Sequence, residues 1–196
     1  AYLDQATEGL WAPLPFGLAQ NCRVGIMGLG RIGTLVADTL HALSFPVAGW
    51  SRTRQSIKGV ETYDAAGFDT FIARTDILIC LLPLTDETRG ILNTRLFDLL
   101  PKGACLVHAG RGAQLNIDAL RIALNSGQIG SAMLDVTDPE PLPSDHWMWT
   151  DPRVIVTPHI ASKTDAAEGA RHALAVIRAE RDHAPIPGLV DQKRGY

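Results

Sequence analysis

Three polar residues of types used in proton and hydride chemistry each lie a few residues after an apolar run typical of a buried strand. They are Arg111, Glu140 and His159. A guanidinium can clamp a carboxylate and polarise an adjacent ketone, and an imidazolium can donate a proton. A carboxylate can hold that imidazole and favour its charged form. The three groups together suit reduction of a 2-oxo acid by a hydride donor, so we predict that they are catalytic.

Each of the three residues also has a simpler interpretation when it is taken alone. Arg111 could cap a turn, Glu140 could be a solvent-facing acid between prolines, and His159 could be a core histidine satisfied by the backbone. Their joint occurrence after successive strands favours a shared site over three unrelated roles.

A glycine pattern near the start of the chain predicts where the hydride donor binds. Residues 23–33 read as a short buried strand, a glycine turn and the first turn of a helix. Gly28 would allow the tight turn, Gly30 would let the backbone approach a pyrophosphate, and Gly33 would let helix and strand pack closely. The same turn places Arg31 and Ile32 at the helix start. The alternative is an ordinary glycine-rich turn, but the flanking strand and helix patterns favour a dinucleotide site.

The residues after the second predicted strand, Phe45–Trp50, indicate which dinucleotide is bound. An acidic residue at this point selects NAD through the ribose 2′-hydroxyl, whereas arginine accommodates the 2′-phosphate of NADP. The residues predicted to surround that ribose are Ser51, Arg52, Thr53 and Arg54. We therefore predict a preference for NADP(H), with NAD(H) possible. The competing interpretation is that the two arginines are solvated surface charges.

The rest of the chain repeats the order strand, helix, strand. Further strands are predicted at 77–82, 104–108, 132–134 and 154–156, and helices at 93–100 and 116–125. Asn116 is the expected N-cap of the second of these helices, and Gly127 follows its end. This alternation predicts an α/β fold with a Rossmann-type doubly wound parallel sheet and a ligand crevice at the carboxyl ends of the strands.

The bulk composition excludes several classes of function. The 196 residues are 46% hydrophobic and 20% charged, with a net charge of -3. This balance gives no general attraction to nucleic acid or to an anionic membrane, and no apolar run is long enough to span a bilayer. The expected location is the cytoplasm. Three cysteines without Cys-x-x-Cys spacing predict buried free thiols, with no metal site.

The run from Val24 to Ser162 resembles the nucleotide-binding domain of the D-isomer-specific 2-hydroxy acid dehydrogenases. The resemblance is carried by Gly28–Gly33, Leu82–Thr88, Arg111–Gly112, Leu134–Val136, Glu140–Leu142 and Pro158–His159. Within that family, three further segments are most similar to the A-type glyoxylate/hydroxypyruvate reductases. These segments are Trp50–Arg54, Ala132–Val136 and Val190–Tyr196.

The resemblance implies NADPH-dependent reduction of small 2-oxo acids such as glyoxylate or hydroxypyruvate. It implies that Arg111, Glu140 and His159 are the catalytic residues. The positions implied to line the nicotinamide and ribose side of the cleft are Leu82, Pro83, Gly110 and Asp135. A homodimer is also implied, with an aromatic residue near Trp11 reaching the active site of the partner. Two positions depart from the family: His108 replaces the usual asparagine, and Gly110 replaces alanine or serine.

The resemblance also predicts how the chain is divided. Residues 1–21 would be a linker, residues 22–162 the dinucleotide-binding domain, and residues 163–196 a helix and tail that run toward a substrate domain largely absent from this chain. A cleft with half its walls missing cannot exclude water, so we expect the fragment to fold and bind NADP(H) but to reduce its substrate poorly.

Two alternatives to this enzyme remain open from the sequence. One is an NAD(P)-binding sensor or scaffold without turnover, since a fold alone does not prove activity. The other is an NAD-dependent 2-hydroxy acid dehydrogenase of different specificity, such as a phosphoglycerate or formate dehydrogenase. The three catalytic residue types argue against the first, and Ser51 with Arg52 argues against the second.

Overall fold

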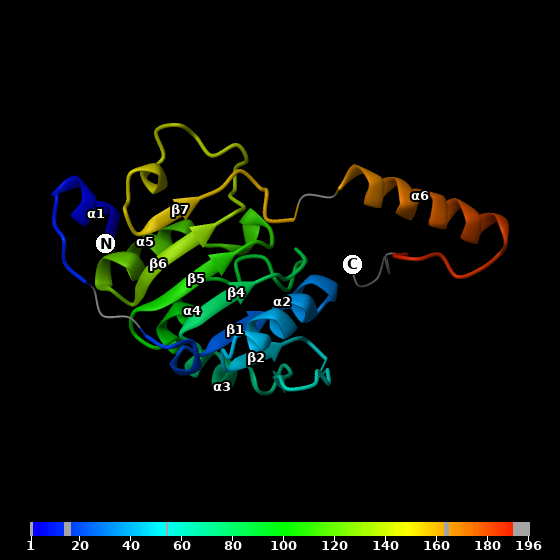
Figure 1. The fold of residues 1–196 in the computed structure, drawn as a ribbon, viewed down its shortest axis with the longest axis horizontal. Coiled ribbons are helices and arrows are strands. Elements are labelled where there is room, and N and C mark those ends of the chain that lie inside the picture. The colour runs from blue at the N-terminus through cyan, green and yellow to red at the C-terminus, as the bar shows by residue number, and fades with distance from the viewer. Residues whose placement is uncertain (1, 14–16, 54, 163–164, 190–196) are drawn as a thin grey trace.

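A seven-stranded sheet forms the centre of the molecule in the computed structural model, which describes residues 2–13, 17–53, 55–162 and 165–189 (Figure 1). All paired strands are parallel, in the order β3-β2-β1-β4-β5-β6-β7. The strands are β1 Val24–Met27, β2 Val47–Trp50, β3 Glu61–Tyr63, β4 Ile77–Cys80, β5 Ala104–His108, β6 Ile129–Leu134 and β7 Val154–Val156. This order confirms the predicted doubly wound α/β sheet, whose direction of winding reverses between β1 and β4.

Helices lie against both faces of the sheet. α2 Arg31–Ala42 lies on one face, and α3 Phe68–Ala73, α4 Thr94–Leu99 and α5 Ile117–Ser126 lie on the other. The remaining helices are α1 Tyr2–Thr7 and α6 Ala166–Arg181, with short 3-10 turns at Ala19–Asn21, Gly112–Gln114 and Trp147–Trp149. The larger core joins one sheet face to Phe71 of α3, Phe97 of α4 and Leu120 of α5. A smaller core on the other face packs Ala37 of α2 against Val24. Successive residues of β4 alternate between the two cores, as the pleat requires.

The helix ends agree with the residue types that the sequence places there. The Asn93 and Asn116 side chains accept hydrogen bonds from the backbone amides of Leu96 and Ala119 and so cap α4 and α5. Gly127 ends α5 in the left-handed conformation, with φ 72°. Both caps match the predicted boundaries of these helices.

The face of the sheet that carries α2 is left partly uncovered toward β7. Ile79, Val107, Met133 and Ile155 are register partners along one row across four strands. The first two are half-buried, whereas Met133 and Ile155 are 41% and 60% exposed. The row therefore presents an apolar surface that the described part of the chain does not cover.

Three short elements were not anticipated from the sequence. They are α1, within the segment expected to be a linker, and β3 and α3, which follow the arginine-containing loop. Residues 11–13 lie outside any helix, as their proline content predicts, and residues 14–16 lie outside the described residues. Helix α2 forms where it was expected, but its most buried positions are Gly33 and Ala37, while Leu35 is exposed.

The C-terminal helix is observed within the segment expected to be helical. α6 extends away from the sheet, and most of its side chains are exposed (Figure 1). Residues 163–164 and 190–196 of the predicted C-terminal segment lie outside the described residues. Where this segment packs in a longer chain stays a prediction.

The predicted buried thiols are found at one position of three. Cys80 is buried, whereas Cys22 and Cys105 are half-buried, and all three are free. In the described ranges no helix is long and apolar enough to cross a bilayer.

Candidate active site

The last residues of the strands form a continuous row across the sheet. Met27 pairs with Trp50 on one side and with Cys80 on the other. Cys80 pairs with His108, which pairs with Leu134 at the end of β6. Since the strands are parallel and end in register, the loops that follow them emerge along one edge. The predicted nucleotide and catalytic residues all lie in these loops or at the start of α2.

The glycine turn after β1 has the geometry of a phosphate-binding turn. Gly28 has φ 103°, and a Cβ there would lie 2.9 Å from the carbonyl oxygen of Leu81. A Cβ on Gly33 would overlap the carbonyl oxygen of Gly28, so only glycine lets α2 approach β1 this closely. A Cβ on Gly30, by contrast, would meet nothing within 4 Å. The N-terminus of α2 is thus open to an approaching anion.

A cavity of about 370 Å³ lies beside this turn. The lining includes Gly28 and Gly30, the loop 51–53 after β2, and the loop that begins at Leu81. Ser51 Oγ donates a hydrogen bond of 2.7 Å to the Thr53 carbonyl, which shapes the first loop. Arg52 Nη1 makes a 2.7 Å ion pair with Glu87 Oε2. This ion pair connects the loop after β2 to the loop after β4, and both residues line the cavity. Arg54 lies outside the described residues.

A second cavity of about 550 Å³ adjoins the first, because Leu81, Leu82 and Pro83 line both. Its other lining residues include Ile32, Gly110, Arg111, Asp135 and His159. The structure therefore brings two of the three predicted catalytic side chains into a space continuous with the glycine turn. Arg31 is exposed and lines neither cavity.

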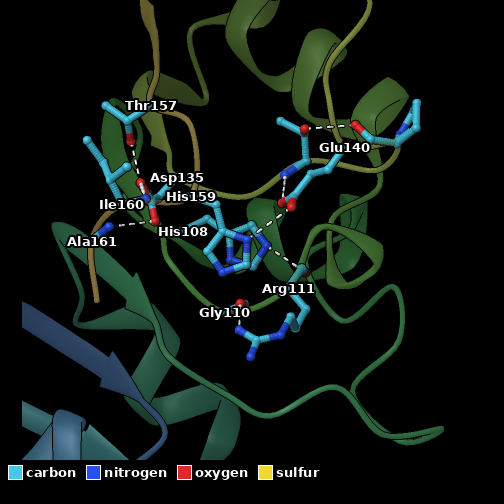
Figure 2. A network of polar contacts seen from close by, with 11 residues as sticks. His108, Gly110, Arg111, Asp135, Glu140, Thr157, His159, Ile160 and Ala161 are labelled. Carbon is cyan, nitrogen blue, oxygen red and sulfur yellow. Dashed lines mark hydrogen bonds and ion pairs between the residues drawn. The ribbon is translucent and has the colours of Figure 1, made fainter. Parts of the chain in front are cut away.

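The third predicted catalytic residue, Glu140, contacts His159 directly. His159 Nδ1 lies 3.0 Å from Glu140 Oε2, and the backbone amide of Thr137 donates to Glu140 Oε1 at 3.0 Å (Figure 2). The hydrogen bond with His159 is the largest influence lowering the pKa of Glu140, and the amide of Thr137 and the charges of His159 and Arg111 lower it further. Because Nδ1 is occupied by the carboxylate, Nε2 is the ring nitrogen left to exchange a proton with a bound molecule.

Asp135 holds the backbone of the His159 loop. Its carboxylate accepts hydrogen bonds from Thr157 Oγ1 at 2.6 Å and from the amides of Ile160 and Ala161, each at 2.9 Å. Burial opposes ionisation, but these three donors and the charge of His159 together outweigh it and lower the pKa of Asp135. His159 itself has φ 53°, in the left-handed region. The buried carboxylate thus stabilises a backbone conformation that non-glycine residues seldom adopt.

Arg111 lies in a turn between β5 and α5. Its Nη1 donates to the Gly110 carbonyl at 2.7 Å, and its side chain is close enough to Glu140 to lower the pKa of that carboxyl (Figure 2). The sequence did not identify the supporting residue Thr157, because its hydroxyl acts on Asp135, which lies 22 residues away in the chain. Among the residues that the structure describes, no three His, Cys, Asp or Glu side chains gather as a metal site.

Comparison with known proteins agrees with this geometry. Residues 1–161 match the family model described as D-isomer specific 2-hydroxyacid dehydrogenase, NAD binding domain. Glyoxylate/hydroxypyruvate reductase A of Salmonella newport is 43% identical over all 196 residues. The chain spans 63% of the length of that curated relative.

Comparison with solved structures finds proteins of the same family. The chain is similar to the NADPH-dependent glyoxylate/hydroxypyruvate reductase of Sinorhizobium meliloti, solved in complex with NADP and sulfate. The TM-score is 0.97 at 40% identity, covering 100% of this chain and 63% of the other. A D-isomer specific 2-hydroxyacid dehydrogenase from Xanthobacter autotrophicus, solved with NADPH and MES, gives a TM-score of 0.96 at 37% identity, covering 100% of this chain and 81% of the other. The chain therefore belongs to the D-isomer specific 2-hydroxyacid dehydrogenase family, and it contains the NAD-binding domain of that family.

Proposed function

We propose that this chain is the nucleotide-binding part of an NADPH-dependent reductase of small 2-oxo acids such as glyoxylate and hydroxypyruvate. One observation carries the proposal. Arg111 and the Glu140-paired His159 border a cavity that shares Leu81, Leu82 and Pro83 with the cavity at the glycine turn. An extended ligand seated on the turn would reach the two catalytic side chains along this shared wall.

The residues around the first cavity fit a dinucleotide with a 2′-phosphate. The N-terminus of α2 and the open backbone at Gly30 suit a pyrophosphate. Arg52 lies at the end of β2, where arginine favours a 2′-phosphate and where a carboxylate would favour the 2′-hydroxyl of NAD. The relatives from Sinorhizobium meliloti and Xanthobacter autotrophicus were solved with NADP and NADPH, which supports the same preference.

The three catalytic side chains have different roles in the reduction of a bound 2-oxo acid. The guanidinium of Arg111 holds the substrate carboxylate and polarises the ketone. His159 donates a proton from Nε2 to the ketone oxygen, and Glu140 orients the ring through Nδ1 and stabilises its charged form. Bound NADPH supplies the hydride.

We further propose that the substrate-binding domain lies mostly outside this chain and that residues 163–196 run toward it. The curated relatives are longer, and α6 extends away from the sheet with an exposed apolar side that includes Leu174 and Ile177. The bare chain is then expected to bind NADPH but to turn over slowly, because the catalytic cavity is not closed to water.

The function is tested by measuring NADPH and NADH oxidation by the full-length protein across a panel of 2-oxo acids. Oxidation of NADPH with glyoxylate or hydroxypyruvate supports the reductase. Binding of NADPH without oxidation by any member of the panel would favour a sensor, and a strong preference for NADH would favour a dehydrogenase of other specificity. If the 196-residue chain alone turned over at the full-length rate, the proposal that most of the substrate-binding domain lies outside this chain would be contradicted.

Removing the arginine that faces the 2′-phosphate is expected to abolish the preference for NADPH. In Arg52→Ala the dissociation constant for NADPH should rise by about 10- to 100-fold, the range for loss of a charge-assisted hydrogen bond, while that for NADH changes little. Fluorescence titration of the two cofactors measures both constants. Arg171→Ala is the matched control, since Arg171 is also exposed and ion-paired but lies on α6. Equal weakening of NADPH and NADH would contradict a role at the 2′-phosphate.

We also propose that two copies of the chain associate. Met133 and Ile155 present apolar area on a sheet face that the described residues leave partly uncovered, and Trp11 is 99% exposed. Exposed apolar patches of this kind mark contact surfaces. Light scattering should give a mass of twice 21.2 kDa for the wild-type chain, and Ile155→Glu should lower it to that of one chain. A monomeric wild type at micromolar concentration would contradict the proposal.

A further inference from the structure

Two buried side chains hydrogen-bond to the backbone of Arg111. His108 and Gln114 are both 0% exposed. His108 Nε2 lies 3.0 Å from the Arg111 carbonyl oxygen (Figure 2). Gln114 Oε1 accepts a 2.8 Å hydrogen bond from the Arg111 amide. The backbone carbonyl and the backbone amide of Arg111 are therefore each hydrogen-bonded to a side chain.

The protonation of His108 is consistent with that role. Burial lowers the pKa of His108 to about 4, against the opposing effect of its hydrogen bond with the Arg111 carbonyl. The ring is neutral at pH 7, and Nε2 carries the proton because its partner is a carbonyl oxygen. His108 thus acts as a neutral donor to the Arg111 turn.

The other end of the Gln114 amide reaches the wall shared by the two cavities. Gln114 Nε2 donates to the Pro83 carbonyl at 2.9 Å and to the Leu82 carbonyl at 3.1 Å. Thr88 Oγ1 donates to the same Pro83 carbonyl at 2.7 Å. One buried amide therefore joins the turn that presents Arg111 to the loop that forms the shared wall.

Gly110 provides the space that this arrangement needs. A Cβ on Gly110 would overlap Gln114 Oε1 and would lie 3.0 Å from the Leu82 carbonyl oxygen. The Gln114 side chain therefore fits in its position only because residue 110 has no side chain. His108, through its hydrogen bond, and Gly110, through the space it leaves, therefore both act on the turn that carries Arg111.

We propose that Gln114, supported by His108 and accommodated by Gly110, is a positioning residue that sets the location of Arg111 relative to the Leu82–Pro83 wall. The proposal rests on the proposed function, in which Arg111 binds the substrate and the wall borders the cofactor. Gln114 acts through Arg111 and need not touch the substrate. Small displacements of such a group lower the rate strongly, by about 100-fold for 1 Å.

The test compares Gln114→Met with Gln128→Met in the full-length protein. Methionine approximates the length of glutamine and removes its hydrogen bonds. Gln128 is a matched control, because its Nε2 also donates to two backbone carbonyls, those of Phe97 and Leu100, each at 2.8 Å. We expect similar losses of thermal stability, but kcat/KM for the 2-oxo acid should fall by about tenfold or more in Gln114→Met alone. Equal kinetic effects of the two variants would overturn the proposal.

A second measurement tests the coupling of Gly110 to Gln114. Gly110→Ala should lower kcat/KM less in a Gln114→Ala background than in the wild type, because the overlapping Oε1 is gone. Additive effects of the two substitutions on kcat/KM would count against the pair acting as a unit.

Hydrogen exchange separates failure of this inference from failure of the proposed function. If the wild type reduces no 2-oxo acid, the proposed function fails, but the Arg111 amide remains a probe of the turn. Gln114→Met should speed exchange of that amide at least tenfold, and Gln128→Met should leave it unchanged. Unchanged exchange in Gln114→Met would overturn the positioning role whether or not the protein is an active reductase.

Discussion

Replacing His159 by asparagine is expected to lower kcat for 2-oxo acid reduction by about 100- to 10,000-fold, the range for loss of a general acid. Asparagine is the appropriate replacement because His159 has φ 53°, and asparagine tolerates the left-handed region better than most residues. The variant should therefore keep the fold and the affinity for NADPH while losing the proton donor. Steady-state kinetics with saturating NADPH measure the change.

Glu140→Gln is the companion variant for this prediction. Glutamine can still accept a hydrogen bond from His159, but it lacks the charge that stabilises the imidazolium. We expect a smaller loss of kcat than in His159→Asn, because glutamine still holds the ring through Nδ1 and only the negative charge beside it is lost. A His159→Asn variant with kcat within threefold of the wild type would exclude His159 as the acid.

The acid side of the pH profile depends on the ionisation of Glu140. Its pKa is lowered in the folded protein, first by the hydrogen bond with His159, from an ordinary value of 4.5. A carboxyl with a lowered folded pKa contributes stability above its unfolded pKa, and that contribution is lost as pH falls through the folded value. Glu140 is therefore ionised at neutral pH, and its contribution to the contact with His159 should be lost only below pH 4.5.

Replacing Arg111 by lysine is expected to lower kcat/KM by about 100- to 1000-fold, even though the positive charge is kept. A guanidinium presents a planar fork of donors that matches a carboxylate, whereas an ammonium is a point charge with no such geometry. Lysine also loses the 2.7 Å hydrogen bond from Nη1 to the Gly110 carbonyl, which helps to fix the direction of the arginine side chain. The KM for the 2-oxo acid and kcat should both change, while the dissociation constant for NADPH should not.

Arg121→Lys is a matched control for that substitution. The Arg121 guanidinium stacks 5.4 Å from the centroid of the Trp147 ring, so lysine disrupts a specific arginine contact there as well. Arg121 does not line the cavity that contains Arg111 and His159. The kcat/KM of the Arg121→Lys variant should therefore stay within about twofold of the wild-type value. Wild-type kinetics in Arg111→Lys would show that Arg111 does not clamp the substrate.

Much of the fold was predictable because its signals are local. The apolar runs of β1, β4 and β5 are continuous, as expected for strands covered on both faces. Glycines at 28 and 33 report a tight turn and a close helix approach, and asparagines at 93 and 116 mark helix starts. The helix caps and the approach of Gly33 to Gly28 depend on interactions within a few residues.

The elements that were missed are short or stabilised from elsewhere in the chain. β3 has three residues at the sheet edge, and α3 has six, so neither is long enough to show two periods of its hydrophobic pattern. α3 is held mainly by burying Phe71 and Ile72 in the larger core. Helical spacing correctly predicted α2, but which of its sides is buried depended on the sheet it packs against.

The sequence by itself determined the glycine turn, the alternation of strands and helices, and the residue types available for the chemistry. Only the tertiary structure decided that Arg111, Glu140 and His159 meet, because the seven parallel strands end in register and their loops share one edge. It alone revealed Gln114, whose amide joins Arg111 to Leu82 and Pro83, which lie 31 to 32 residues from it in the chain. Contacts of that separation depend on the register of the sheet, and no pattern within a short window of sequence encodes them.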